Sequence, residues 1–131
     1  MSHFLFVYGT LMSAFKNHYA EFLKQNGRLT GSGFISARLY DVGEYPAAVF
    51  DVDSKYSVTG EIWYISNFDT TISIFDEYEG INEIEPEYHR ECIEVLTVEK
   101  NKINCWTYFY NFEATFLQEI ETGDYLKWKI K

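Results

Sequence analysis

The sequence predicts an α+β domain in which a closed or nearly closed β-sheet carries most of the chain and helices are few. Apolar residues make up 47 % of it, and tyrosine and phenylalanine contribute 11 each, a composition that favours strands over a helical bundle. Its 131 residues suit one domain with its own core, so we expect a single domain over residues 1–131. About six or seven short apolar runs between turn residues indicate strands, and closing the sheet would remove their exposed edges.

The first forty residues are predicted to form a strand, a helix and a second strand. Residues 3–8 are a short apolar run that ends at a glycine, which is typical of a buried strand. Residues 13–26 carry aromatic and leucine side chains at helical spacing and end in Asn-Gly, so we expect a helix there. Residues 28–40 are expected to be extended, with Gly31 and Gly33 as bulges or bends.

The middle of the chain is predicted to add two strands and another helix. Residues 47–52 follow a Tyr-Pro corner, and residues 58–65 contain Gly60, which inside a strand marks a close approach of another backbone. Residues 69–79 have apolar side chains at helical spacing. The aspartate at the start of this helix is the expected N-cap, and the glycine just past its end is the expected stop.

The last third is predicted to be a hairpin followed by one short strand. Residues 91–98 and 102–110 are expected to pair across a turn at Lys100-Asn101. Residues 123–131 alternate in polarity, which predicts a strand with a split face.

The two cysteines indicate reduced thiols in a cytoplasmic protein. The predicted hairpin places Cys92 opposite a residue near Phe109 and Cys105 opposite one near Leu96, so we expect no disulfide. The N-terminus lacks the pattern of a signal peptide, and no apolar run approaches the roughly 20 residues that span a bilayer.

The charge balance argues against nucleic acid and membranes as partners. The chain has 20 acidic and 11 basic residues and a net charge of -9, which repels phosphate backbones and anionic lipids. The charge says nothing further about the substrate, because many cytosolic proteins are acidic, and the sequence carries no signal for an oligomeric state.

The motifs of metal and nucleotide chemistry are missing. The three histidines, His3, His18 and His89, are widely separated and match no metal-ligand spacing. There is no phosphate-binding loop and no Gly-x-Ser-x-Gly elbow. We therefore expect neither a metal nor a cofactor.

The segment Tyr8-Gly9-Thr10-Leu11 is a candidate anion site. It follows a buried strand and precedes a helix, and backbone N–H groups at such a strand end can bind a carboxylate. Glycine also lets a ligand approach the backbone closely. Taken alone, the segment favours a plain strand-to-helix turn over an anion site.

The acidic segment Asp76-Glu77-Tyr78-Glu79 is a candidate source of a general base. A carboxyl at the C-terminus of a helix, near aromatic side chains and other acids, tends to have a raised pKa. A raised pKa improves a base that works near neutrality. The alternative is a solvated acidic helix face.

Six short motifs, in order along the chain, resemble the gamma-glutamylcyclotransferase-like family. They are Tyr8-Gly9-Thr10-Leu11, Tyr45-Pro46-Ala47, Val58-Thr59-Gly60-Glu61, Asp76-Glu77-Tyr78-Glu79-Gly80, Tyr88-His89-Arg90 and Gly123-Asp124-Tyr125. Each motif is weak alone, but their common order over residues 4–126 covers nearly the whole domain.

The resemblance implies a small mixed β-barrel flanked by a few helices, with Glu79 as the catalytic glutamate. It implies that Tyr8, Gly9, Thr10 and Leu11 hold the gamma-glutamyl group and that Tyr88 lies near the pocket. The implied reaction closes the gamma-glutamyl group to 5-oxoproline and releases the attached amine or amino acid, with Glu79 as general acid and base. Asp76 and Glu77 are interpreted as structural or solvated, and Arg90 as a possible structural partner of the acidic helix.

Two other functions fit the same residues. A non-catalytic domain could bind a glutamyl-like ligand in this pocket, or the substrate could be a gamma-glutamyl group on a larger carrier.

Residues 81–87 add Glu83, Glu85 and Glu87 to the acids near Glu79. If they rim the pocket, cationic leaving groups are favoured over carboxylate-bearing ones such as that of glutathione; otherwise they form a solvated loop.

Overall fold

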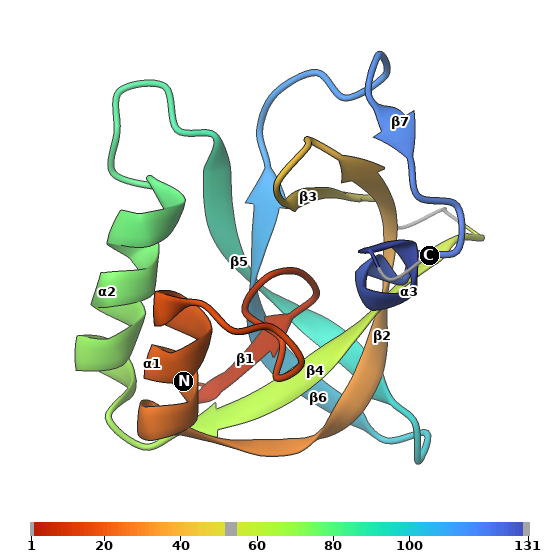
Figure 1. Ribbon diagram of the computed structural model, residues 1–131. Helices are drawn as coiled ribbons and strands as arrows, with labels where there is room; N and C mark the ends of the chain where they lie inside the picture. The colour runs from red at the N-terminus through yellow and green to blue at the C-terminus, as the bar shows by residue number, and fades with distance from the viewer. Residues whose placement is uncertain (1, 52–54, 130–131) are drawn as a thin grey trace.

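A closed five-stranded barrel forms the centre of the protein in the computed structural model, which describes residues 2–51 and 55–129 (Figure 1). The strand order is β2-β4-β1-β6-β5, and β5 pairs with β2 to close the barrel. Only β1 and β6 pair in parallel among these strands. The predicted closed sheet is therefore confirmed. Its strands are β1 (Phe4–Val7), β2 (Gly27–Asp41), β4 (Ser57–Ile65), β5 (Tyr88–Thr97) and β6 (Lys102–Tyr110).

The long strand β2 serves both the barrel and a second small sheet. Its first part pairs with β4, and its last part pairs with β3 (Pro46–Phe50) and β7 (Gln118–Glu119). The register shifts between Leu29 and Gly31, so the bulge expected at Gly31 is confirmed. Val52, the predicted end of the third strand, lies outside the described residues.

Two glycines allow the barrel walls to approach closely. A Cβ on Gly33, where β2 meets β5, would lie 2.9 Å from the carbonyl oxygen of Leu96. A Cβ on Gly60 would lie 2.4 Å from the carbonyl oxygen of Val7, so the close approach predicted in β4 is confirmed. Neither contact leaves room for a side chain.

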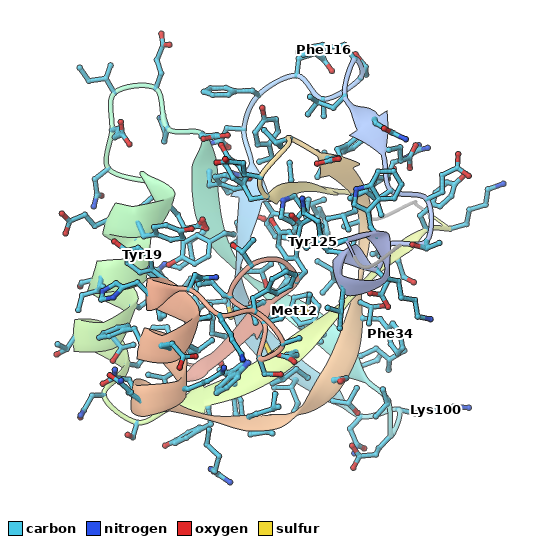
Figure 2. All side chains as sticks on the ribbon, in the orientation of Figure 1. Met12, Tyr19, Phe34, Lys100, Phe116 and Tyr125 are labelled. Atoms are coloured by element: carbon cyan, nitrogen blue, oxygen red, sulfur yellow. The ribbon has the colours of Figure 1, made fainter. Side chains whose placement is uncertain are left out.

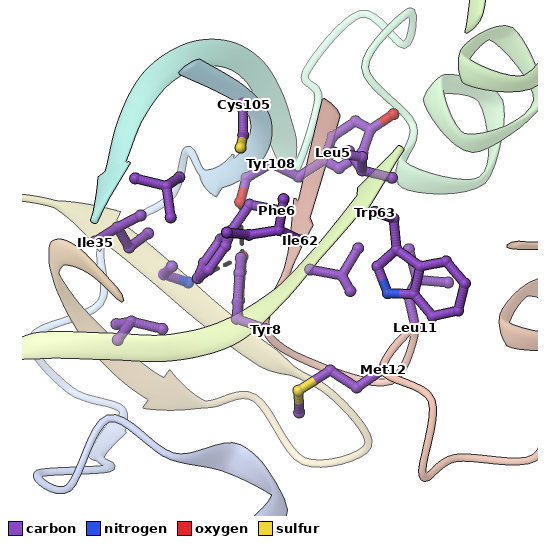
Figure 3. Close-up of a cluster of buried hydrophobic side chains, with 14 of the residues drawn as sticks. Leu5, Phe6, Tyr8, Leu11, Met12, Ile35, Ile62, Trp63, Cys105 and Tyr108 are labelled. Carbon is purple, nitrogen blue, oxygen red and sulfur yellow. Dashed lines mark hydrogen bonds between the residues drawn. The ribbon is translucent and has the colours of Figure 1, made fainter. Parts of the chain in front are cut away.

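The interior of the barrel is a dense apolar core that ends at the candidate site. Phe6, Ile62 and Cys105 lie together there, and Tyr8 follows Phe6 toward one end (Figure 3). Burial raises the pKa of the Cys105 thiol to about 12, and both cysteines are free, as predicted.

Helices α1 (His18–Asn26) and α2 (Phe68–Glu79) pack side by side against one side of the barrel (Figure 1). Tyr19, labelled in Figure 2, stacks on Tyr78 with ring centroids 3.8 Å apart.

The predicted start of the first helix at residue 13 is wrong. The helix begins after Asn17, because the Asn17 side chain caps it by accepting a 2.8 Å hydrogen bond from the N–H of Ala20.

Three other expectations from the sequence need correction. Asp69 does not cap α2, because the helix begins one residue earlier and Asn67 holds the cap position. Residues 125–129 form helix α3 (Tyr125–Lys129) rather than a strand; Asp124 accepts a 3.1 Å hydrogen bond from the N–H of Lys127, as a helix cap does. Residues 130–131 of the predicted strand lie outside the described residues.

The hairpin register is the third correction. Ile93 pairs with Cys105 and Cys92 with Trp106, three residues away from the predicted register. Lys100 adopts a left-handed conformation with φ 68°, and the Thr97 N–H donates to the Asn101 carbonyl, so the chain reverses earlier than the predicted turn.

No helix among the described residues is both long and apolar enough to cross a bilayer.

Candidate active site

A cavity of about 160 Å³ lies at the end of the barrel interior, between three walls. The first wall is the end of β1 and the loop after it, the second is the C-terminus of α2, and the third is formed by the starts of β3 and β5. The cavity brings together all six residues that the sequence singled out. Its lining is Phe6, Val7, Tyr8, Gly9, Thr10, Leu11, Tyr45, Pro46, Tyr78, Glu79, Glu87, Tyr88 and Tyr108.

Tyr8 fixes the first wall to the barrel. Its hydroxyl donates a 2.7 Å hydrogen bond to the carbonyl oxygen of Tyr108 and accepts a 3.3 Å hydrogen bond from the N–H of Ala48 (Figure 3). Burial, followed by the charge of Glu79, raises the Tyr8 pKa well above its ordinary value. Tyr8 is therefore a neutral side chain that ties β1 to β6 and β3.

Gly9 is required by the close packing of the third wall. A Cβ at this position would lie 2.7 Å from Cγ of Pro46. The loop turns here, because the N–H of Met12 donates a 3.1 Å hydrogen bond to the carbonyl oxygen of Gly9. The carbonyl of Thr10 accepts a 2.7 Å hydrogen bond from the Asn17 side chain, so the loop is tied to the start of α1.

Glu61 holds the far end of this loop, a role that the sequence did not reveal. Its carboxylate accepts hydrogen bonds from the N–H of Ser13, at 2.7 Å, and from the Ser13 hydroxyl, at 2.5 Å. The indole N–H of Trp63 donates a third hydrogen bond at 3.2 Å. The glutamate of the Val-x-Gly-Glu motif thus positions the loop and does not enter the cavity lining.

Glu79 is the last residue of α2 and lines the cavity. The chain turns away immediately after it, because Gly80 adopts a left-handed conformation with φ 73°, as predicted. Among the described residues, the Glu79 carboxyl has no hydrogen-bond partner and no cation beside it. Burial raises the Glu79 pKa to about 7, and the negative charges of Glu87 and Asp76 act in the same direction.

Asp76 has a structural role, in agreement with the interpretation from sequence. Arg90 donates two hydrogen bonds to it, at 2.8 and 3.0 Å, and the Tyr108 hydroxyl donates a third at 2.7 Å. The Arg90 guanidinium also lies 4.5 Å from the ring centroid of Trp106. This network joins α2 to β5 and β6 and fixes the helix that presents Glu79.

The third wall is formed by two tyrosines and one further carboxylate. Tyr88 is buried, and its hydroxyl donates a 2.8 Å hydrogen bond to the carbonyl oxygen of Pro46. The Tyr45 hydroxyl donates a 2.6 Å hydrogen bond to Oε2 of Glu87. Glu83 and Glu85 are exposed and lie outside the lining. Of the three glutamates in residues 81–87, only Glu87 lines the cavity.

The chemistry available in the cavity follows from these side chains. A carboxyl with a pKa near neutrality can accept a proton from a substrate and return it. The loop at Gly9 and Thr10 lines the cavity, and backbone N–H groups of such a loop can bind an anion. Within residues 2–51 and 55–129, no group of three or more acidic, histidine or cysteine side chains is arranged to hold a metal ion.

Sequence comparisons connect this chain to known proteins. Residues 5–127 match the family model described as "Gamma-glutamyl cyclotransferase, AIG2-like". A Vibrio cholerae protein named "Putative gamma-glutamylcyclotransferase" is 31 % identical over 127 residues, which cover 95 % of this chain and 96 % of the relative.

Solved structures share the fold. The protein ytfP from Escherichia coli is 29 % identical, with a TM-score of 0.68 over 96 % of this chain and 98 % of that one. YkqA from Bacillus subtilis is 24 % identical, with a TM-score of 0.76 over 99 % of this chain. The chain spans only 42 % of the length of YkqA, which therefore contains more than this fold.

Proposed function

Because the chain belongs to the gamma-glutamyl cyclotransferase, AIG2-like family, we propose that it is an enzyme that converts gamma-glutamyl compounds to 5-oxoproline. The observation that carries the proposal is the Glu79 carboxyl, which faces the cavity without a partner among the described residues and has a pKa of about 7. A half-buried, desolvated carboxyl without a structural partner is costly for the fold, and it is useful if it moves a proton.

The reaction begins with the α-ammonium group of the substrate, which must lose a proton before it can attack. The Glu79 carboxylate accepts that proton, and the α-amine attacks the substrate's own γ-carbonyl carbon. The C–N bond of the five-membered lactam forms as the bond to the leaving nitrogen breaks. Glu79 then gives its proton to that nitrogen, so the carboxylate is regenerated and no other reactant is consumed.

The loop from Gly9 to Leu11 supports this reaction by orientation. Its backbone N–H groups are suited to the α-carboxylate of the substrate, which would otherwise be an anion in a cavity whose charged side chains are both acidic. Tyr8, the Asn17 side chain and Glu61 hold the loop rigid. Holding a chain in a cyclising conformation can lower such a barrier by several kcal/mol, up to about 7–11.

The size of the cavity favours a small substrate, and its charge favours catalysis over binding alone. The cavity of about 160 Å³ is smaller than the roughly 300–1,000 Å³ of sites for drug-sized ligands, so it suits a small gamma-glutamyl compound. A domain that only bound this group would be better served by a basic side chain at its carboxylate than by Glu79. The free thiols suit a reducing compartment such as the cytoplasm.

The test is the formation of 5-oxoproline from a panel of gamma-glutamyl compounds. The panel should include gamma-glutamyl amines, gamma-glutamyl amino acids, glutathione and a gamma-glutamyl group attached to a peptide carrier. We expect turnover of at least one compound by the wild type and none above background by Glu79→Gln. A Glu79→Gln variant that retains full activity on a compound that the wild type turns over would refute the proposed chemistry.

A further inference from the structure

The charged side chains in the cavity lining are two carboxyl groups, Glu79 and Glu87, and no basic side chain is present among the described lining residues. The proposed reaction uses only Glu79. Glu87 lies on the wall formed by the starts of β3 and β5, whereas Glu79 comes from the C-terminus of α2. Glu87 therefore needs a separate explanation.

Glu87 is held firmly in place, unlike the other acids of its segment. Its Oε2 atom accepts the 2.6 Å hydrogen bond from the Tyr45 hydroxyl. Its backbone carbonyl accepts a 2.8 Å hydrogen bond from the N–H of Asn111, and the Asn111 side chain donates to the carbonyl of Pro86 at 3.0 Å. Both the backbone and one carboxylate oxygen are therefore fixed before any ligand arrives.

The other half of the Glu87 carboxylate is available. Among the described residues, no donor bonds to Oε1, and no lysine, arginine or histidine pairs with Glu87. The Tyr45 hydroxyl satisfies one carboxylate oxygen, but no cation in the described part of the chain offsets the charge of Glu87, which repels the second carboxyl of the cavity and raises the pKa of Glu79. A fixed carboxylate with an open oxygen in a cavity is suited to a cationic group.

We propose that Glu87, held by Tyr45, is a specificity-determining residue that receives a cationic group on the leaving portion of the substrate. This assignment rests on the proposed function, in which Glu79 and the loop from Gly9 to Leu11 bind the glutamyl portion. The third wall is then left for the leaving group. An ammonium on its tail would donate to Oε1 of Glu87, whereas a carboxylate there would meet like charge.

Three synthetic compounds with the same number of carbons in the tail test the proposal. Each carries the gamma-glutamyl group on a four-carbon amine: one on 1,4-diaminobutane, with an ammonium at its end, one on butylamine, with a methyl, and one on 4-aminobutyrate, with a carboxylate. Dissociation constants are measured by calorimetry on the Glu79→Gln protein, which removes the base, with and without Glu87→Gln. Values of kcat/KM are measured on proteins that retain Glu79.

With Glu87 present, affinity should follow the order ammonium, methyl, carboxylate. Glu87→Gln should weaken the ammonium compound by about 10- to 100-fold, as expected for loss of a hydrogen bond to a charged group. The methyl compound should change less than about threefold, and the carboxylate compound should bind equally or more tightly. Tyr45→Phe should reduce the ammonium preference in part, because it frees the Glu87 side chain while keeping its charge.

The outcomes separate this proposal from the proposed function. Equal changes for all three compounds, or none, would overturn the role of Glu87 even if 5-oxoproline is formed. A charge-dependent loss of binding without any 5-oxoproline from the wild type would support the Glu87 subsite and refute the reaction. Absence of binding for all three compounds at millimolar concentration would overturn the Glu87 subsite, provided that the variants unfold at the same temperature as the wild type. The proposed function would fail with it only if the wild type also formed no 5-oxoproline from the full panel.

Discussion

Replacing Glu79 with glutamine should abolish activity and stabilise the fold. The wild-type carboxyl has a pKa of about 7 in the folded protein against an ordinary value of 4.5, a difference of about 2.5 units. At about 1.4 kcal/mol per unit, ionised Glu79 destabilises the folded state by roughly 3 kcal/mol, which is an upper value because water can enter the cavity. Glutamine has the same shape and no charge, so it removes this destabilisation.

The raised Glu79 pKa fixes the direction in which the free energy of unfolding changes with pH. Between pH 4.5 and 7 the folded wild type retains a proton that the unfolded chain has lost, so its free energy of unfolding falls as the pH rises. In the Glu79→Gln protein this decrease in the free energy of unfolding is absent. Its advantage over the wild type should therefore grow from roughly 1 kcal/mol at pH 5 to roughly 3 kcal/mol at pH 8.

Urea denaturation of both proteins at pH 5 and pH 8 measures this difference, with kcat/KM measured in parallel. Turnover should fall by roughly 10²–10⁴-fold or to background. Glu77→Gln is the matched control, because Glu77 is the exposed acid two residues earlier. A Glu79→Gln advantage that stays constant from pH 5 to pH 8 would show that the Glu79 charge is solvated, and the argument from its pKa would fail.

Three further predictions follow from the same contacts. In wild type, kcat/KM for an uncharged-tail substrate should rise with pH and reach half its plateau near pH 7, where Glu79 loses its proton; a flat profile from pH 5.5 to 8.5 would contradict this. Asp76→Asn, which weakens the network with Arg90, should lower the free energy of unfolding by about 3–5 kcal/mol; a loss below about 0.5 kcal/mol in urea would count against it. Gly60→Ala should lower it by about 1–3 kcal/mol, because the Cβ meets the carbonyl oxygen of Val7; unchanged stability would disprove that contact.

The sequence predicted the features that depend on neighbouring residues. Short apolar runs located the barrel strands, and glycine identified the bulge at Gly31, the close approach at Gly60 and the end of α2 at Gly80. The motifs around Tyr8 and Glu79 were placed in one cavity, although they are about seventy residues apart in sequence. Resemblance to a family supplied that link, since spacing alone does not bring them together.

The sequence did not predict features that depend on distant partners. Glu61 positions the loop through Ser13, and Glu87 is fixed by Tyr45; these contacts join residues 48 and 42 positions apart. The hairpin register failed because a turn residue with positive φ moved the reversal point, and a polar sequence does not show which residue will adopt that conformation. The five residues of α3 are too few for helical spacing to be distinguished from alternation.

The pairing of β1 with β6 determines when the cavity can form during synthesis of the chain. This strand leaves the ribosome before the others, yet Leu5 pairs with Trp106, and Tyr8 bonds to the backbone of Tyr108. At about 5–20 residues per second, β1 waits roughly 5–20 s for β6 to be synthesised. A nascent chain that stops before β6 keeps Glu79 and the loop at Gly9 but lacks Tyr108, which bonds to Tyr8 on one wall and to Asp76 of α2 on the other. The proposed lactam formation would therefore require completed synthesis of the barrel, and fragments from early termination would be inert rather than partly active.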